Sequence, residues 1–410
     1  MATPISLDYG SAVPASVPAG RLFVIEAASS VCGNFLQIGV FFYTTHLLGW
    51  SLKQNFLLSA GQGLSYVVGA LSAHPLAKLG RQRILAIIFA TMAAIIALPL
   101  VFCNSPTIAI CLLFYTLMIG ITWPILESLL SANLDPQALS RRLGLYNIIW
   151  AATGAIAVAC SGAIISRFAW GIFAIPCAAH AFSALALATQ RAGPVDSRVI
   201  SSSDVPVLHP EPQLLAIRTL ALWLSRIALP ATYVVIYSLA AMMPTLPVIQ
   251  HLNVAGQTFV GSTWMVARFV AFLLLSGLWW HTRPRALLAA TAIMLLAFLA
   301  ITVPASRYFG VSATADLTIM IAAQIALGFA MGLIYTASLY FGMVLSEGST
   351  EHGGYHEALI GLGCILGPGA GAAARILAPD SPSLPILGVA GLILLSLVAS
   401  VVASALARDS

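Results

Sequence analysis

Residues 84–102 read ILAIIFATMAAIIALPLVF, a run of nineteen residues without a charged side chain. A helix of about 20 apolar residues is long enough to cross the ~30 Å hydrocarbon core of a bilayer. The chain holds twelve such runs, near 22–48, 56–76, 84–102, 107–133, 142–166, 169–189, 216–242, 255–280, 286–304, 316–345, 355–377 and 384–406. The runs are continuous and do not alternate between apolar and polar residues, which argues against a strand barrel. The sequence therefore predicts an all-α polytopic membrane protein with twelve transmembrane helices.

The composition of the 410 residues leads to the same class of protein. Hydrophobic residues make up 60% of the chain and charged residues 8%, whereas soluble domains carry about 25% charged residues. This excludes a cytosolic enzyme, a nucleic-acid-binding protein and a disordered regulator. Walker, GxSxG and HExxH motifs are absent, and the six cysteines lack metal-ligand spacing. We therefore expect a protein that is not an enzyme and has no catalytic residues, cofactor or metal.

The basic residues orient the chain in the membrane. If the N-terminus lies inside, twelve Lys and Arg residues fall in inner segments and four in outer segments. Cytoplasmic loops carry such an excess of positive charge. We expect both termini in the cytoplasm and the protein in a bacterial inner membrane.

The chain divides into two similar parts. The longest polar segment, around 190–213, separates six apolar runs from six others, and the expected domains are 1–189, a cytoplasmic linker at 190–215, and 216–410. The letters RQRIL at 81–85 recur as RPRAL at 283–287, and the spacing of one Tyr and two Gly residues over 146–162 recurs over 355–371. These matches indicate a duplicated six-helix unit, as in many transporters. Chance similarity among Gly-rich apolar helices is the alternative.

A duplicated chain with basic turns after its second and eighth helices resembles the major facilitator superfamily. The stretch AHPLAKLGRQR at 73–83 is similar to the family's loop signature G-x-L-A-D-R-x-G-R-K, with Ala77 in place of the acidic residue. The resemblance implies two pseudo-symmetric six-helix bundles that rock about a midplane cavity. It also implies a gating role for the basic turn and its glycine, that is, for Lys78, Gly80, Arg81 and Arg83.

Two carboxylates lie within apolar runs, where ionisable side chains by default mark a pathway, a coupling site or a pairing. Glu26 shares a helical face with Asn34 and Gln37 in the first run, and Glu127 lies in the fourth. Burial disfavours a charged carboxyl, so the protonation of either residue can follow its exposure to water. We expect proton coupling at Glu127 or Glu26. The alternatives are an ion pair between Glu127 and a basic residue of the next loop, and an interfacial position for Glu26.

Polar and aromatic side chains recur at helical spacing in other runs. Arg268 lies near the middle of the eighth run, where it should pair with a carboxylate or meet an anionic substrate. Trp and Tyr residues beside amides suit a small, partly apolar, hydrogen-bonding solute. The expected substrate-binding residues are Asn34, Gln37, Trp123, Trp150, Tyr233, Tyr237, Trp264, Arg268, Gln324 and Tyr335. Ordinary helix packing is the alternative for each, and Arg226 and Glu357 are expected to act in gating.

These patterns together predict a secondary active transporter that moves a small organic solute by alternating access, coupled to protons. A facilitative carrier or exchanger without proton coupling is the first alternative. A transport-inactive membrane receptor on the same scaffold is the second, and a membrane-embedded enzyme acting on lipid is the third. The expected partners are the small-molecule substrate, protons and the lipid bilayer, with no nucleic acid, and the monomer is expected to be functional.

Overall fold

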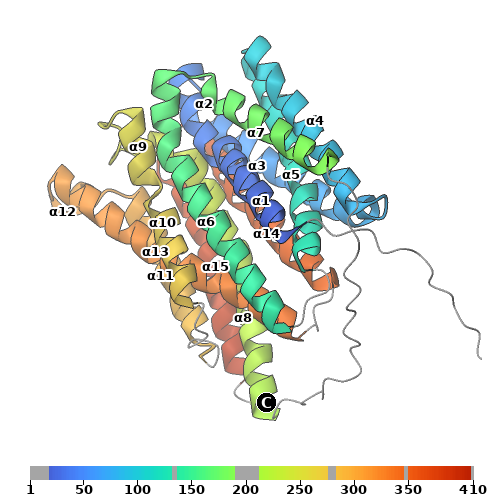
Figure 1. Ribbon diagram of the computed structural model, residues 1–410. Coiled ribbons are helices and arrows are strands. Elements are labelled where there is room, and N and C mark those ends of the chain that lie inside the picture. Colours follow the sequence, from blue (N-terminus) through green and yellow to red (C-terminus); the bar gives the residue numbers. More distant parts are fainter. Residues whose placement is uncertain (1–17, 132–135, 190–211, 276–282, 346–349, 408–410) are drawn as a thin grey trace, which may run out of the picture.

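The computed structural model describes residues 18–131, 136–189, 212–275, 283–345 and 350–407. Across these ranges all regular secondary structure is helical (Figure 1). The expected linker at 190–215 lies almost entirely outside the described residues, as do both chain ends.

The helices before residue 190 begin and end close to the predicted apolar runs. They are α1 (Ala19–Asn34), η1 (Phe35–Gly39), α2 (Val40–Leu48), α3 (Leu52–Ala77), α4 (Arg81–Val101), α5 (Ser105–Ser131), α6 (Pro136–Arg167) and α7 (Gly171–Ala188). Local capping explains several boundaries. Ser51 and Gln54 form a capping box at the start of α3, and Gly80, with a φ of 106°, permits the tight turn between α3 and α4.

The helices after residue 211 follow the same pattern. They are α8 (Pro212–Met242), η3 (Met243–Thr245), α9 (Val254–Gly261), α10 (Thr263–Leu275), α11 (Ala286–Thr302), α12 (Ser306–Phe309), α13 (Ala313–Leu345), α14 (Thr350–Leu377) and α15 (Leu384–Leu406). The predicted eighth run is divided at Ser262 into α9 and α10. Asn253 caps the start of α9 by accepting a hydrogen bond from the Gly256 amide at 2.8 Å.

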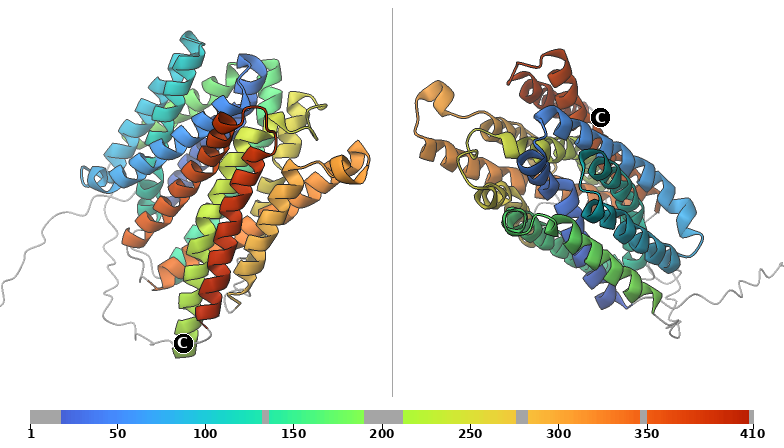
Figure 2. Two further views of the ribbon diagram at one scale, coloured as in Figure 1. Left: turned by 180° about the vertical axis from the view of Figure 1, so that it is seen from behind. Right: turned by 90° about the horizontal axis from the view of Figure 1, so that it is seen from above.

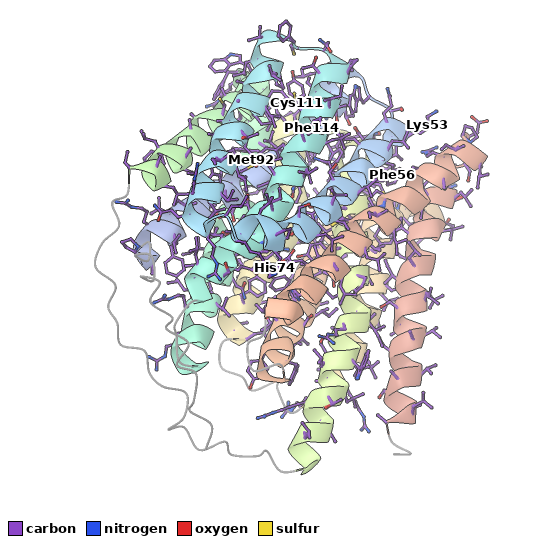
Figure 3. All side chains as sticks on the ribbon, turned by 90° about the vertical axis from the view of Figure 1, so that its right-hand side faces the viewer. Lys53, Phe56, His74, Met92, Cys111 and Phe114 are labelled. Atoms are coloured by element: carbon purple, nitrogen blue, oxygen red, sulfur yellow. The ribbon has the colours of Figure 1, made fainter. Side chains whose placement is uncertain are left out.

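The length and apolarity of these helices identify an integral membrane protein. Within the described ranges, 11 helices are long and apolar enough to cross a membrane, and α11 is apolar but shorter, at 17 residues. Large apolar side chains also cover the outer faces of the molecule. Phe114, labelled in Figure 3, is 54% exposed, and Leu71 is 69% exposed. Such faces are unfavourable in water and suit contact with lipid tails.

Helices that are distant in sequence pack against one another across the middle of the molecule. In two opposite views, α3, α4, α5 and α7 gather on one side and α10, α11 and α13 on the other (Figures 1 and 2). Between these groups, α3 packs on α14, and α6 packs on α9 and α10. The α3–α14 packing is very close because a Cβ on Gly63 would lie 2.6 Å from the backbone of Cys364. Small residues allow this kind of approach in membrane helices.

The first span departs from regular α-helix at a polar position. A π-helical turn occupies Phe35–Gly39, and the Leu36 carbonyl accepts a hydrogen bond from the Gln62 side chain of α3 at 3.0 Å. Single π turns occur frequently at functional sites. This turn carries Gln37, one of the residues expected to bind substrate.

Candidate functional site

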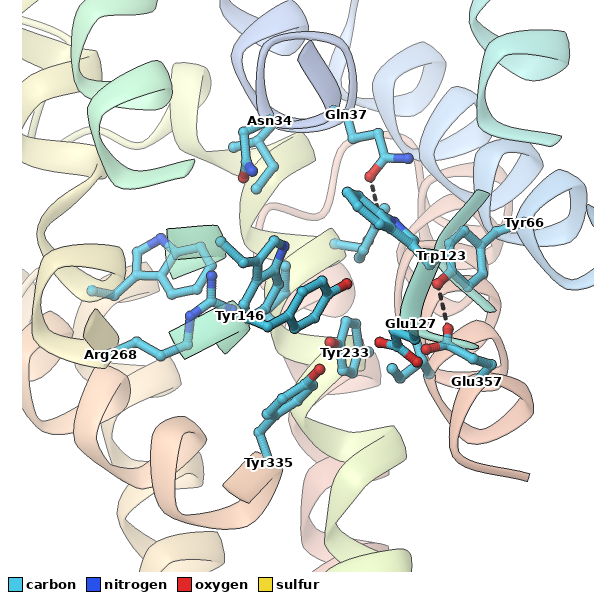
Figure 4. A pocket seen from close by; sticks show the side chains of 17 residues that line it. Asn34, Gln37, Tyr66, Trp123, Glu127, Tyr146, Tyr233, Arg268, Tyr335 and Glu357 are labelled. Atoms are coloured by element: carbon cyan, nitrogen blue, oxygen red, sulfur yellow. Dashed lines mark hydrogen bonds between the residues drawn. The ribbon is translucent and has the colours of Figure 1, made fainter. Parts of the chain in front are cut away.

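A partly open cavity lies among the helices. Its walls come from α1, η1, α3, α5, α6, α8, α10, α13 and α14, which belong to both parts of the chain (Figure 4). The structure brings together here nine of the ten expected substrate-binding residues: Asn34, Gln37, Trp123, Trp150, Tyr233, Tyr237, Trp264, Arg268 and Tyr335. Glu127 also lines the cavity.

One expected substrate-binding residue and one expected proton-coupling residue lie outside the cavity wall. Gln324 is fully buried in α13, and both polar atoms of its side-chain amide lack a hydrogen-bond partner among the described residues. Glu26 is also fully buried and accepts a hydrogen bond from the Ser30 hydroxyl at 2.8 Å. Its side chain is therefore enclosed by protein and makes a local contact within α1.

Several cavity residues were missed by the sequence analysis: Gly33, Ile38, Tyr66, Tyr146, Ile236 and Ile360. Tyr146 lies four residues before Trp150 on α6, so helical spacing placed it on the same face. Tyr66 lies four residues after Gln62 on α3, but Gln62 itself was not a candidate. The missed isoleucines carry no polar signal that would separate them from ordinary packing residues.

Arg268 occupies one end of the cavity (Figure 4). Its guanidinium carbon lies 4.2 Å from the ring centroid of Trp150 and 4.9 Å from that of Trp264. These cation–π contacts stabilise the charge without using its in-plane N–H donors. Within the described residues, Arg268 makes no ion pair with a carboxylate, and its buried Nε atom has no hydrogen-bond partner. The residue is only 4% exposed.

Close packing between α10 and α13 fixes the position of Arg268. A Cβ on Gly328 of α13 would lie 2.6 Å from the Ala267 Cβ and 2.8 Å from the Arg268 backbone nitrogen. Two turns further along α13, Tyr335 stacks on Trp150, with ring centroids 5.5 Å apart and planes at 24°. Gly328 therefore lets α13 approach α10 closely at Arg268, and Tyr335 packs against the Trp150 ring that the guanidinium contacts.

Amide side chains of the first span line another wall of the cavity. The Tyr237 hydroxyl donates a hydrogen bond of 2.9 Å to Gln37 Oε1 (Figure 4). Gln37 Nε2 is buried without a hydrogen-bond partner in the described part of the chain. Asn34 Nδ2 donates to the Ser30 carbonyl at 2.8 Å, and Gly154 of α6 leaves the space for this amide.

Glu127 and Glu357 mark the opposite end of the cavity from Arg268 (Figure 4). The Tyr66 hydroxyl donates a hydrogen bond to Glu357 Oε2, and Tyr146 lines the cavity beside Glu127. Glu357 was expected at a gate, and the structure places it in the cavity wall, close enough to Glu127 for their charges to interact. Two such carboxylates repel each other when both are charged, and a proton on one of them removes the repulsion.

The other residues expected in gating lie outside the cavity wall. Lys78, Gly80, Arg81 and Arg83 are all exposed at the α3–α4 turn. Arg226 is half-buried on α8, close enough to His356 for their charges to interact. In the described ranges, no three His, Cys, Asp or Glu side chains are grouped as metal ligands.

Polar contacts also join the two parts of the chain at the end of the molecule near α2 and α9. His46 Nε2 and Gln257 Oε1 lie 2.9 Å apart. The Gly162 amide of α6 donates a hydrogen bond of 3.1 Å to the Thr258 hydroxyl of α9. A Cβ on Gly162 would lie 2.5 Å from the same hydroxyl oxygen, so this contact depends on the glycine.

Comparison with known proteins finds one matching family and similar solved structures. A family profile described as the Major Facilitator Superfamily matches residues 24–368. A point mutant of the nucleoside transporter NupG has a similar solved structure, with a TM-score of 0.68 and 13% identity over 94% of this chain and 99% of that one. A second NupG structure gives a TM-score of 0.67 and 13% identity over 95% and 98%. No curated protein sequence matches the chain.

Proposed function

We propose that this chain, which belongs to the Major Facilitator Superfamily, is a secondary active transporter of a small organic solute, driven by protons and working by alternating access. One observation carries the proposal. The cavity is walled by helices from both parts of the chain and lined by buried polar and aromatic groups. Lipid cannot satisfy such groups, so a cavity that holds them suits water and a solute.

The proposed architecture has twelve membrane spans in two six-helix halves. The α11 helix supplies the twelfth span, because its 17 residues are strongly apolar. The halves comprise residues 1–189 and 216–410, joined by a linker at 190–215, with both termini in the cytoplasm of a bacterial inner membrane. The internal sequence matches and the positive-inside count support this arrangement. The proposed functional unit is the monomer.

Alternating access is supported by where the halves touch. Residues of α2 and α6 bond to α9 at one end of the molecule, through His46–Gln257 and Gly162–Thr258. The cavity lies deeper, between α3 and α14 and between α6 and α10. Opening the contact at α9 while the halves close at the far end would expose the cavity to the other side. In this proposal the exposed turn at 78–83 and Arg226 act at the cytoplasmic gate.

Proton coupling is assigned to Glu127, with Glu357 beside it. Both carboxylates line the cavity, and they come from different halves. A proton held between them lowers their mutual repulsion when the halves approach. Glu26 is also close enough for its charge to interact with Glu127, and it is the second candidate.

The test is uptake into proteoliposomes that contain the purified full chain. Radiolabelled uridine, phenylacetate and phenylalanine serve as probes, uridine because NupG is a nucleoside transporter. We expect an inward proton gradient to drive accumulation of a probe by the wild type above the level of protein-free vesicles. Glu127→Gln should lose accumulation and retain counterflow, whereas Asp380→Asn, which changes an exposed carboxylate, should behave as the wild type.

Two outcomes would contradict the proposal. If the wild type moves no probe, the proposal that the chain transports these classes of solute is wrong. If wild type and Glu127→Gln move a probe equally with and without the gradient, the chain is a facilitative carrier or exchanger.

A further inference from the structure

We propose that the solute is an organic anion, a carboxylate attached to a planar apolar body, and that Arg268 binds its charged group. This inference rests on the proposed function, because it names the substrate class of the same cavity. It also assigns a role to a buried charge that has no ion-pair partner among the described residues.

The first step concerns the state of Arg268. Its side chain is 4% exposed, and its electrostatic neighbours are Tyr233 and Tyr335 instead of a carboxylate. An unpaired buried cation is costly, and the cation–π contacts with Trp150 and Trp264 compensate for only part of that cost. The guanidinium plane presents N–H donors at its edge, where a carboxylate accepts two parallel hydrogen bonds. An anion in the cavity would therefore satisfy both the charge and the donors.

The second step concerns the other free donor in the cavity. Gln37 Nε2 is buried without a partner, while its Oε1 is already occupied by Tyr237. Of the polar atoms that line this cavity and lack partners in the described structure, Arg268 Nε and Gln37 Nε2 are both donors. A solute rich in acceptors fits this set better than a solute rich in donors.

The third step concerns the rest of the solute. Trp150 stacks on Tyr335 directly beside Arg268, and Ile38 and Ile236 line the same cavity. Aromatic faces and branched apolar side chains favour a flat, apolar body. At the acidic end, Glu357 is already hydrogen-bonded by Tyr66, and Glu127 has Tyr146 beside it. Each of these carboxylates therefore already has a donor beside it, whereas Arg268 Nε has no acceptor among the described residues, so the unmet need in the cavity is for an acceptor.

The test compares three ligands of similar shape on the purified full chain in detergent. Phenylacetate, phenylacetamide and benzylamine present a carboxylate, a neutral amide and an ammonium on the same ring. Binding is measured by thermal shift and by quenching of tryptophan fluorescence, with uridine as a neutral reference. We expect phenylacetate to bind roughly 10- to 100-fold more tightly than phenylacetamide, the range for a hydrogen-bonded buried charge, and benzylamine to bind more weakly still.

Variants assign the preference to Arg268. Arg268→Gln should bind phenylacetate and phenylacetamide with similar affinity, and Arg268→Lys should keep part of the preference as a point charge without the planar fork. Arg167→Gln, which changes an exposed arginine, should bind as the wild type. If Arg268→Gln fails to fold, Gln37→Leu supplies the second readout and should weaken phenylacetate binding by roughly 5- to 10-fold.

Several results would overturn the inference. They are equal binding of phenylacetate and phenylacetamide by the wild type, an unchanged preference in Arg268→Gln, or the absence of binding by phenylacetate. Binding and uptake of uridine alone would overturn it while leaving the proposed transporter function intact. Tight binding of phenylacetate without uptake of any probe would support it and contradict the transporter proposal.

Discussion

Replacing Gly63 by alanine tests whether the α3–α14 contact is a tight backbone packing. The added Cβ would lie 2.6 Å from the carbonyl carbon and oxygen of Cys364 and 2.8 Å from the Ile365 nitrogen. All three are backbone atoms, so no side-chain rotation relieves the contact. Ordinary van der Waals contact for a Cβ begins at 3.4 Å, so α3 and α14 must separate locally by about 0.8 Å, the difference between 3.4 and 2.6 Å.

The size of the effect follows from two opposing terms. Overpacking a close contact costs about 1–3 kcal/mol, and a rigid backbone neighbour argues for the upper part of that range. Alanine is favoured over glycine inside a helix by up to about 1 kcal/mol. We therefore expect Gly63→Ala to lose about 2 kcal/mol of stability. The same displacement would move Tyr66, three residues further along α3, away from Glu357, so uptake should fall as well.

In the assay, the purified chain is heated in detergent, and the fraction that stays monodisperse is measured at each temperature. Gly369→Ala on α14 is the matched control, because a Cβ there meets nothing within 4 Å. It should be as stable as the wild type or slightly more stable. A Gly63→Ala variant with wild-type stability, beside a well-behaved control, would refute the close packing of α3 on α14.

Two other predictions concern contacts between the halves. Tyr66→Phe removes the donor to Glu357 and should lower the free energy of unfolding by about 1.5–3 kcal/mol, the range for a hydrogen bond to a charged group. The loss should largely vanish in a Glu357→Leu background, which has no acceptor, and shrink to about 0.5–1.5 kcal/mol in a Glu357→Gln background, which keeps a neutral one. Additive losses in the Glu357→Leu background would show that the two residues are not coupled. Gln257→Ala removes the partner of His46 and should loosen the contact at α9. In a cysteine-free chain that carries Asn34→Cys, a thiol reagent added on the side of α9 should then label the new cysteine faster. An unchanged labelling rate from that side would count against a gate at α9.

The helices could be predicted because their signal is local. An apolar run of sufficient length can be recognised without knowing its neighbours, and the observed boundaries of α3 and α15 lie within four residues of the predicted ones. The face that carries Trp264 and Arg268 was also readable, because residues four apart share one side of a helix. Both residues line the cavity.

The depth and extent of the cavity could not be read from one helix. Gln324 and Tyr335 share a face of α13, yet they are eleven residues apart, or about 16 Å along the axis at 1.5 Å per residue. The cavity reaches Tyr335 and not Gln324. Likewise, Glu357 looked like a gate residue because it follows a polar turn. In the cavity wall it pairs with Tyr66, 291 residues away, because α14 packs on α3, and such a pairing leaves no trace in local spacing.

The basic and acidic ends of the cavity share one structural property that bears on the proposed coupling. At the basic end, Trp150 of α6 covers Arg268 of α10, and at the acidic end Tyr66 of α3 bonds Glu357 of α14. In each pair, one residue comes from before the segment at 190–211 and the other from after it. A rigid-body rotation of one half would therefore alter the anion site and the carboxylate pair in the same movement. A ligand shifts the equilibrium between two conformations only through its different affinity for the two. A solute at Arg268 and a proton at Glu127 or Glu357 would therefore influence one another through the position of the halves, without direct contact between solute and proton.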